Sequence, residues 1–186
     1  MGDAAPTALA FACHPESAFR RFHLLGGFRD PLIYTILLGG PPLLLGVVLK
    51  VLLLPSEVAL SGNGALPGPL MALALVFVVP PLYVYIRAQA VHLGLVLRGR
   101  VQRPFEVTFR LVAYANASVA PVLIVPIVGD FVFLALGALV ETVGLRECQR
   151  LSARDACLAE VLPAGMLLLG FLAILVVGFL WWSQVL

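Results

Sequence analysis

Long apolar runs separated by short polar stretches dominate the chain, and this pattern predicts membrane-spanning helices. A helix rises about 1.5 Å per residue, so about 20 apolar residues cross the roughly 30 Å hydrocarbon core of a bilayer. Five runs predict spans at residues 32–54, 70–97, 107–125, 131–145 and 164–186. The sequence therefore predicts an all-α polytopic membrane protein, in which a segment 1–31 precedes a five-helix membrane domain 32–186.

Proline and glycine interrupt these runs. Pro80-Pro81 predicts a kink in the second run, which is longer than a perpendicular crossing requires. The stretch 126–130 predicts a chain reversal between the third and fourth runs, because one helix through both would far exceed a span. The fourth run is short, so a re-entrant hairpin is the alternative to two full spans.

Composition supports the membrane prediction. Hydrophobic residues make up 61% of the chain and charged residues 12%, whereas soluble domains average about 25% charged residues. A net charge of +2 is too small to indicate a nucleic-acid partner, and the lipid bilayer is the predicted environment. Three cysteines without regular spacing predict neither a disulfide framework nor a metal site, and no cofactor is expected.

The basic residues alternate strictly from one connection to the next. Nine arginines lie in the N-terminal segment and in the connections 98–103 and 146–154, whereas 55–69, the turn at Asp130 and the C-terminal tail contain no Lys or Arg. Short loops rich in arginine stay in the cytoplasm, so the sequence predicts a cytoplasmic N-terminus and a C-terminus on the outside. Six of these arginines form a candidate face for anionic lipid or a partner: Arg98, Arg100, Arg103, Arg146, Arg150 and Arg154. The alternative is that they only set the orientation.

Residues 17–28 of the N-terminal segment interleave aromatic and basic residues. This pattern is compatible with a short amphipathic helix in the headgroup layer. An ordinary lead-in to the first span is the favoured interpretation.

Four ionisable residues among apolar neighbours form a candidate intramembrane polar cluster: Arg87, His92, Arg110 and Glu141. Helical rise places Arg87, Arg110 and Glu141 in the cytoplasmic leaflet, and we expect Glu141 to pair with Arg110 or Arg87. The alternative is independent side chains that extend to the interface. Asn116 and Ser118, deep in the third run, predict hydrogen bonds between helices.

Motifs for chemistry are missing from the sequence. It contains no HExxH, no GxSxG and no Walker-type glycine-rich loop. We therefore expect a protein that is not an enzyme.

Scattered positions across residues 85–165 carry a family resemblance. They include His92 before the basic turn, Thr108-Phe109-Arg110, Pro126 with Gly129, and the approach from Arg154 to Pro163. This part of the chain resembles the Yip1 domain family in its bacterial branch. The resemblance implies five spans, a cytoplasmic N-terminus and a bacterial cytoplasmic (inner) membrane.

Eukaryotic members of the Yip1 family look like trafficking factors that associate with Rab GTPases. Their D-L-x-G-P-L motif is replaced here by Asp30-Pro31-Leu32, so that partner is not implied for this chain.

Two classes of function follow from these features. The leading prediction is a non-enzymatic scaffold or adaptor that organises membrane or protein partners through a basic cytoplasmic face. The alternative is a small oligomeric transporter or channel, because the spans of this chain that Pro41-Pro42 and Pro80-Pro81 interrupt resemble the broken helices that line transporter sites. Partners would be anionic lipids, a second copy of the chain or other membrane proteins.

Overall fold

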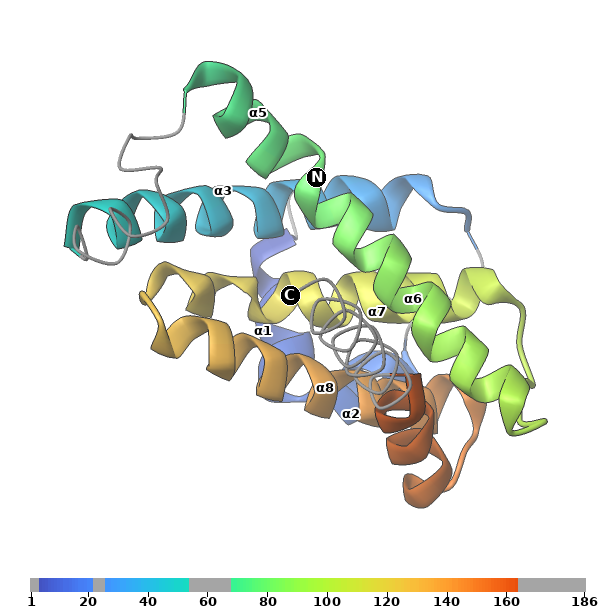
Figure 1. Cartoon of the computed structure of the whole chain (residues 1–186). Helices are drawn as coiled ribbons and strands as arrows, with labels where there is room; N and C mark the ends of the chain where they lie inside the picture. The colour runs from blue at the N-terminus through green and yellow to red at the C-terminus, as the bar shows by residue number, and fades with distance from the viewer. Residues whose placement is uncertain (1–3, 22–25, 54–67, 164–186) are drawn as a thin grey trace, which may run out of the picture.

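The computed structural model describes residues 4–21, 26–53 and 68–163, and within these ranges all regular structure is helical (Figure 1). The helices are α1 (Ala4–Cys13), α2 (Pro15–Arg20), α3 (Arg29–Leu53), α5 (Pro69–Phe77), α6 (Val79–Leu97), α7 (Phe105–Val119), the 3₁₀ helix η1 (Ala120–Ile124) and α8 (Val128–Gln149). Residues 153–163 are also helical. The predicted fifth span, 164–186, lies outside the described residues.

Four helical stretches of the described chain are long and apolar enough to cross a membrane: Arg29–Leu53, Pro69–Leu97, Phe105–Ile124 and Val128–Gln149. They correspond in order to the first four predicted spans, so the chain is an all-helical protein compatible with integral membrane insertion. The fourth is 22 residues long, not the 15 that hydropathy suggests, because the helix begins at Val128, ahead of the predicted start, and continues through Arg146 and its polar neighbours to Gln149. Its length is sufficient for a full crossing.

The second span is broken where the sequence predicts a kink. Helix α5 ends at Phe77 and α6 begins at Val79, so Pro80 and Pro81 lie in the first turn of α6. Proline is tolerated there because the N–H groups of a first helical turn have no partner within the helix. Pro41-Pro42, by contrast, lies inside the continuous helix α3.

Helices α7 and α8 form an antiparallel hairpin closed by η1. The chain reverses at Ile127, which has a positive φ of 63°. At Gly129 a Cβ atom would clash with the backbone of Val122, so glycine lets the start of α8 approach η1 closely. The predicted reversal at 126–130 is therefore present.

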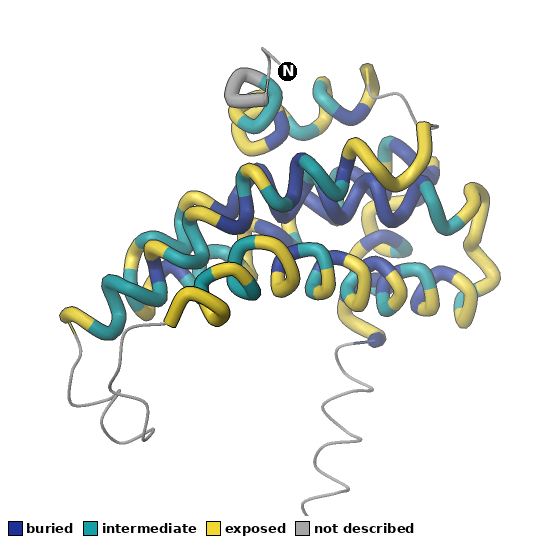
Figure 2. Tube along the Cα trace, turned by 90° about the horizontal axis from the view of Figure 1, so that it is seen from above, coloured by how far each residue is buried: buried dark blue, intermediate teal, exposed yellow. Residues whose placement is uncertain are grey.

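Helix α7 is the centre of the bundle, with α1, α3, α6 and α8 packed around it. Twelve of its 15 residues are buried, and Figure 2 shows the buried positions gathered inside the bundle. Glycines allow the outer helices to pack closely: at Gly40 of α3 a Cβ atom would lie 2.7 Å from the carbonyl oxygen of Val76 in α5. Close packing of this kind is typical of membrane helices.

The N-terminal helices pack on the bundle, α1 against α7 and α2 against α8. Phe11 and Phe19 are buried, with ring centroids 4.8 Å apart, and the Phe11 ring lies 5.5 Å from that of Tyr114. Helix α2 ends at Arg20, and Phe28 precedes α3 outside any helix. The first part of the segment 17–28 thus belongs to a short helix whose Phe19 ring lies beside Gly144 of α8, and residues 22–25 of the segment lie outside the described residues.

Candidate functional site

A network of ionisable and polar side chains lies inside the bundle, where α6, α7, α8 and the helical stretch 153–163 meet. Arg87 of α6 contacts Glu141 of α8, with Nη2 3.1 Å and Nε 3.2 Å from Oε2. The same Nη2 atom also donates to Oε2 of Glu160 in the helical stretch 153–163. Glu141 is 1% exposed and Glu160 5% exposed, so both carboxylates are removed from water and lipid.

Asn116 joins α7 to this network. Its Nδ2 atom donates to Oε1 of Glu141 and, at 2.8 Å, to the carbonyl oxygen of Val112. The amide therefore supports one carboxylate and also satisfies a backbone acceptor of its own helix. The hydrogen bond confirms the expected interhelical role of Asn116.

The network extends to the middle of the α7–α8 hairpin. Asn116 is 11 residues from Phe105, about 16 Å along the helix, and 8 residues from Ile124, about 14 Å with the steeper 3₁₀ rise. This is deeper than the half of the bundle to which the sequence assigns Arg87 and Glu141. The network reaches this depth because Glu141 of α8 accepts a hydrogen bond from Asn116, which lies near the middle of α7 and η1.

Close packing between α6 and the helical stretch 153–163 places Glu160 beside Arg87. A Cβ atom at Gly94 would clash with the carbonyl group of Ala159, so glycine allows the two helices to cross closely. The helix 153–163 is preceded by Ser152, whose Oγ accepts a hydrogen bond from the backbone N–H of Asp155 at 3.1 Å. Such a cap satisfies a free donor of the first turn.

Sequence reasoning missed Glu160 because it treated residues 146–160 as a polar connector. In the structure Ala156, Ala159, Glu160 and Pro163 are buried at spacings of three, four and seven, which is the period of one helix face. Glu160 shares that inward face.

The other two residues of the predicted cluster lie nearer the end of the bundle. Arg110 Nη1 donates to the carbonyl oxygen of Gly27 at 3.0 Å. His92 Nδ1 lies 3.2 Å from Oγ1 of Thr108. The structure thus brings Arg87 and Glu141 together, places Arg110 and His92 elsewhere, and pairs Glu141 with Arg87 rather than with Arg110.

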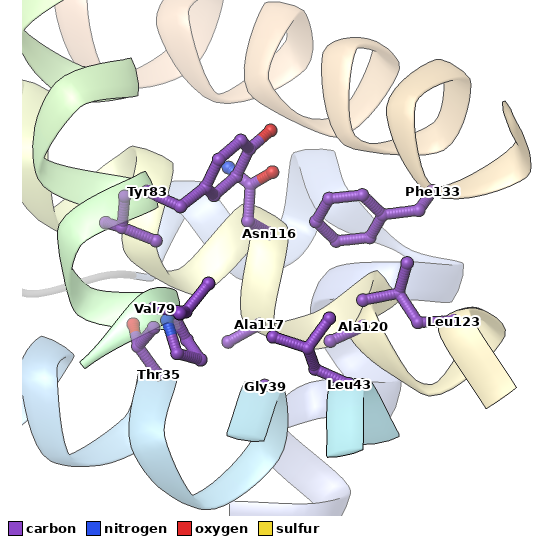
Figure 3. Close-up of a pocket in the computed structure, with 12 residues that line it drawn as sticks. Thr35, Gly39, Leu43, Val79, Tyr83, Asn116, Ala117, Ala120, Leu123 and Phe133 are labelled. Atoms are coloured by element: carbon purple, nitrogen blue, oxygen red, sulfur yellow. The ribbon is translucent and has the colours of Figure 1, made fainter. Parts of the chain in front are cut away.

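A cavity of about 170 Å³ lies beside the network and opens between the helices. In Figure 3 the phenol of Tyr83 and the amide of Asn116 stand at one end, and Leu43 and Leu123 lie at the other. The lining comes from α3, α6, α7, η1 and α8: Thr35, Gly39, Leu43, Val79, Pro80, Tyr83, Val84, Asn116, Ala117, Ala120, Leu123 and Phe133. Asn116 belongs to both features, so one amide separates the cavity from Glu141.

A second polar region lies where the arginine-bearing connections meet, and we call it the arginine end. Arg98 Nη2 lies 2.6 Å from Oδ1 of Asp155, which ties the 98–103 connection to the start of the helix 153–163. Arg20 Nε lies 2.9 Å from Oε2 of Glu147, which ties α2 to α8. The three connections predicted to share one side therefore contact one another.

Arginines of this end differ in how they are used. The side chain of Arg98 is 25% exposed and is held by Asp155, whereas that of Arg100 is 58% exposed and lies 3.9 Å from the same carboxylate. Arg103, Arg146, Arg150 and Arg154 are exposed and make no ion pair with a described residue. Arg98 is thus part of an internal contact, while five arginines of the predicted face are accessible.

An open hollow of about 650 Å³ lies between α2 and α8 at the arginine end. Its charged lining consists of Glu16 together with Arg20, Arg21 and Arg146, so the positive groups are in excess. Anionic groups are favoured in such surroundings.

The opposite end of the bundle carries a single described ion pair, between Lys50 Nζ and Asp130 Oδ2 at 2.6 Å. Lys50 of α3 therefore contacts the first turn of α8.

Metal chemistry finds no support in the described residues, which contain no group of three or more His, Cys, Asp or Glu side chains placed to hold an ion. Cys148 is buried as a free thiol, and Cys13 and Cys157 are exposed free thiols. Comparisons with protein-family models, curated proteins and solved structures returned no match.

Proposed function

We propose that this chain is a non-enzymatic membrane scaffold or adaptor of Yip1 type, which binds anionic lipid headgroups or protein partners at its arginine end. The observation that carries the proposal is a group of exposed arginines that form no ion pair with a described residue: Arg103, Arg146, Arg150 and Arg154. Arg100 is also exposed, and it lies 3.9 Å from Asp155. These arginines come from two connections that the Arg98–Asp155 pair holds together.

Electrostatics supports lipid as one occupant of this face. An arginine near an anionic membrane surface gains about 1 kcal/mol, so several arginines held together act cumulatively. The hollow beside Arg21 and Arg146 adds a concave place where one headgroup would meet more than one guanidinium. A protein partner with an acidic surface would use the same arginines.

Topology is part of the proposal. The arginine end faces the cytoplasm by the positive-inside rule, the C-terminus lies outside, and residues 164–186 supply the fifth span. The resemblance to bacterial members of the Yip1 family makes the inner membrane the proposed location.

The test is purification of the full chain in its native lipid, followed by mass spectrometry of bound lipids and proteins. The variant Arg103/Arg150/Arg154→Gln should lose most of the anionic lipid or the specific protein that wild type retains. The matched control, Arg103/Arg150/Arg154→Lys, preserves the charge and should retain anionic lipid. Equal retention of lipids and proteins by wild type and the Gln variant would refute the proposal.

A small transporter or channel is the second candidate, and the cavity at Pro80 and Asn116 is the observation that favours it. Broken helices and buried polar groups near the middle of a bundle are features of transporter sites. Solute flux into liposomes that is abolished by Pro80/Pro81→Ala, with the protein still folded, would favour this candidate. Absence of flux for every tested ion and small solute would count against it.

A further inference from the structure

Two buried glutamates share one basic side chain. Glu141 and Glu160 both contact Nη2 of Arg87. No other basic side chain of the described chain forms an ion pair with either carboxylate, and residues 164–186 contain no Lys, Arg or His. Fully ionised, the network would therefore hold two negative charges and one positive charge.

Neighbouring polar groups do not balance this excess. Asn116 reaches Glu141 from α7 as a neutral amide that donates a hydrogen bond. Tyr83, one turn before Arg87 on α6, lies within electrostatic range of Arg87 and both glutamates, and its phenol is neutral at neutral pH. Neither group adds positive charge, so one negative charge remains uncompensated.

A second observation points to the position of the missing positive charge. Atom Oε1 of Glu160 is buried and accepts no hydrogen bond from the described residues, whereas Oε2 contacts Arg87. An ionised carboxylate oxygen without a partner is costly away from water. Two carboxylates that share one site also repel one another, which favours a proton on one of them.

We infer that Glu141 and Glu160 hold one exchangeable proton beside Arg87, which makes this network a proton-binding site inside the bundle. Binding converts one carboxylate into a carboxylic acid. The proton comes from water and returns to water, and no other covalent bond changes. The inference stands apart from the proposed role of the arginine end, because none of the exposed arginines takes part.

A metal ion fits the same place less well. Arg87 already occupies Oε2 of both glutamates, which leaves few oxygen atoms for an ion that needs six or more ligands or a near-octahedral shell. A proton needs a single oxygen atom. The protonated network is neutral, and Glu160 then keeps the helix 153–163 in contact with α6.

Infrared difference spectroscopy tests the inference on the full chain in lipid nanodiscs, with glutamate labelled with ¹³C at the side-chain carboxyl group. Wild type should show the band of a protonated glutamate at neutral pH, with reversible loss at alkaline pH. Glu160→Gln and Glu141→Gln should each lose the band, because the remaining glutamate then pairs with Arg87 in ionised form. Glu147→Gln, which removes a carboxylate at the arginine end, should retain it.

A further variant keeps the test valid even where a substitution in the network prevents folding. Replacing the other four glutamates, Glu16, Glu57, Glu106 and Glu147, by Gln leaves only the two network carboxyls to give a labelled signal. The band should persist in this variant. Its absence from wild type, its loss from the fourfold variant, or its persistence in both Glu160→Gln and Glu141→Gln would overturn the inference. Stabilisation by Na⁺ at fixed pH without any such band would show a metal cation in place of the proton.

Discussion

Helix α7 and the α5–α6 pair are both apolar enough to cross a membrane, yet they occupy opposite environments. The most apolar 18-residue window of the span Phe105–Ile124 has a mean hydropathy of 1.5 and is 72% buried, whereas that of Pro69–Leu97 has a mean hydropathy of 2.1 and is 11% buried. The less apolar span therefore lies at the centre. In α5 no residue is buried, and Leu70 is 84% exposed.

This difference follows from the bilayer as solvent. Lipid tails are as apolar as leucine, so burying a leucine between helices gains little, whereas a polar group in lipid needs a partner inside the protein. Helix α7 finds such partners in several directions: Ser118 bonds Tyr34 of α3, Asn116 bonds Glu141 of α8, and Arg110 bonds Gly27 ahead of α3. Polarity thus places α7 inside, whereas α5 and the outer face of α6 remain exposed and one face of α6 packs on α7.

Arg87 of α6 forms ion pairs with two buried glutamates inside the bundle, and its removal should have the largest effect on stability. Arg87→Leu leaves two buried carboxyl groups without their cation, and breaking a buried pair costs about 3–5 kcal/mol. The measurement is the free energy of unfolding in mixed micelles. Gln89→Leu, an exposed position two residues along α6, is the matched control and should change stability little. Equal effects of the two substitutions would show that the network does not hold α6 to α8.

An added side chain separates the two environments by packing. Ala115→Leu in α7 enlarges a fully buried position and should destabilise the bundle by about 1–3 kcal/mol. Ala72→Leu makes the same change on α5, where no residue is buried, and should be tolerated. The thermal unfolding temperature of each variant in detergent gives the comparison. A greater loss from Ala72→Leu than from Ala115→Leu would contradict the central position of α7.

The smallest effect is expected at the arginine end, where Asp155 holds the last turn of α6 through Arg98. The hydrogen bond from Ser152, together with the charges of Arg100 and Arg98, lowers the pKa of Asp155 below its ordinary value of 3.8. Because the folded state has the lower pKa, the stabilisation is complete above pH 3.8 and is lost as the pH falls through that lower value.

Asp155→Asn should remove this pH dependence. The difference in unfolding temperature between wild type and Asp155→Asn should be constant near neutral pH and should shrink in acid. A constant difference down to the lowest pH at which the protein folds would show that the pair adds no stability. Screening by salt should also reduce the difference, because the pair is accessible to solvent.

Much of the architecture was predictable from local features of the chain. Pro80 ends the preceding helix because proline lacks an N–H group, and the reversal before Asp130 follows from the length of the combined apolar run. The fourth span was underestimated since hydropathy stops at Arg146, whereas the helix continues through polar residues that face the arginine end. Hydropathy measures transfer into lipid and does not measure helix length.

The candidate site was predictable only in part. Arg87 and Glu141 were identifiable as ionisable residues in apolar surroundings. Their third partner was not, because Glu160 follows a polar stretch and comes 73 residues after Arg87 in the chain. The N-terminal helices were missed for a related reason: α1 contains no charge and no strong periodicity, and Phe11 acquires its role only on contact with Tyr114.

By itself, the sequence determined that the chain forms apolar helices, where the first four begin and end to within a turn or two, and which connections carry arginine. Those properties depend on transfer free energies and backbone chemistry, which act residue by residue. Only the tertiary structure decided that α7 lies at the centre, that α1 and α2 pack on the bundle, and that Glu160 returns to Arg87. Such pairings depend on which distant groups meet at contact distance, and glycines such as Gly94 permit that contact without revealing the partner.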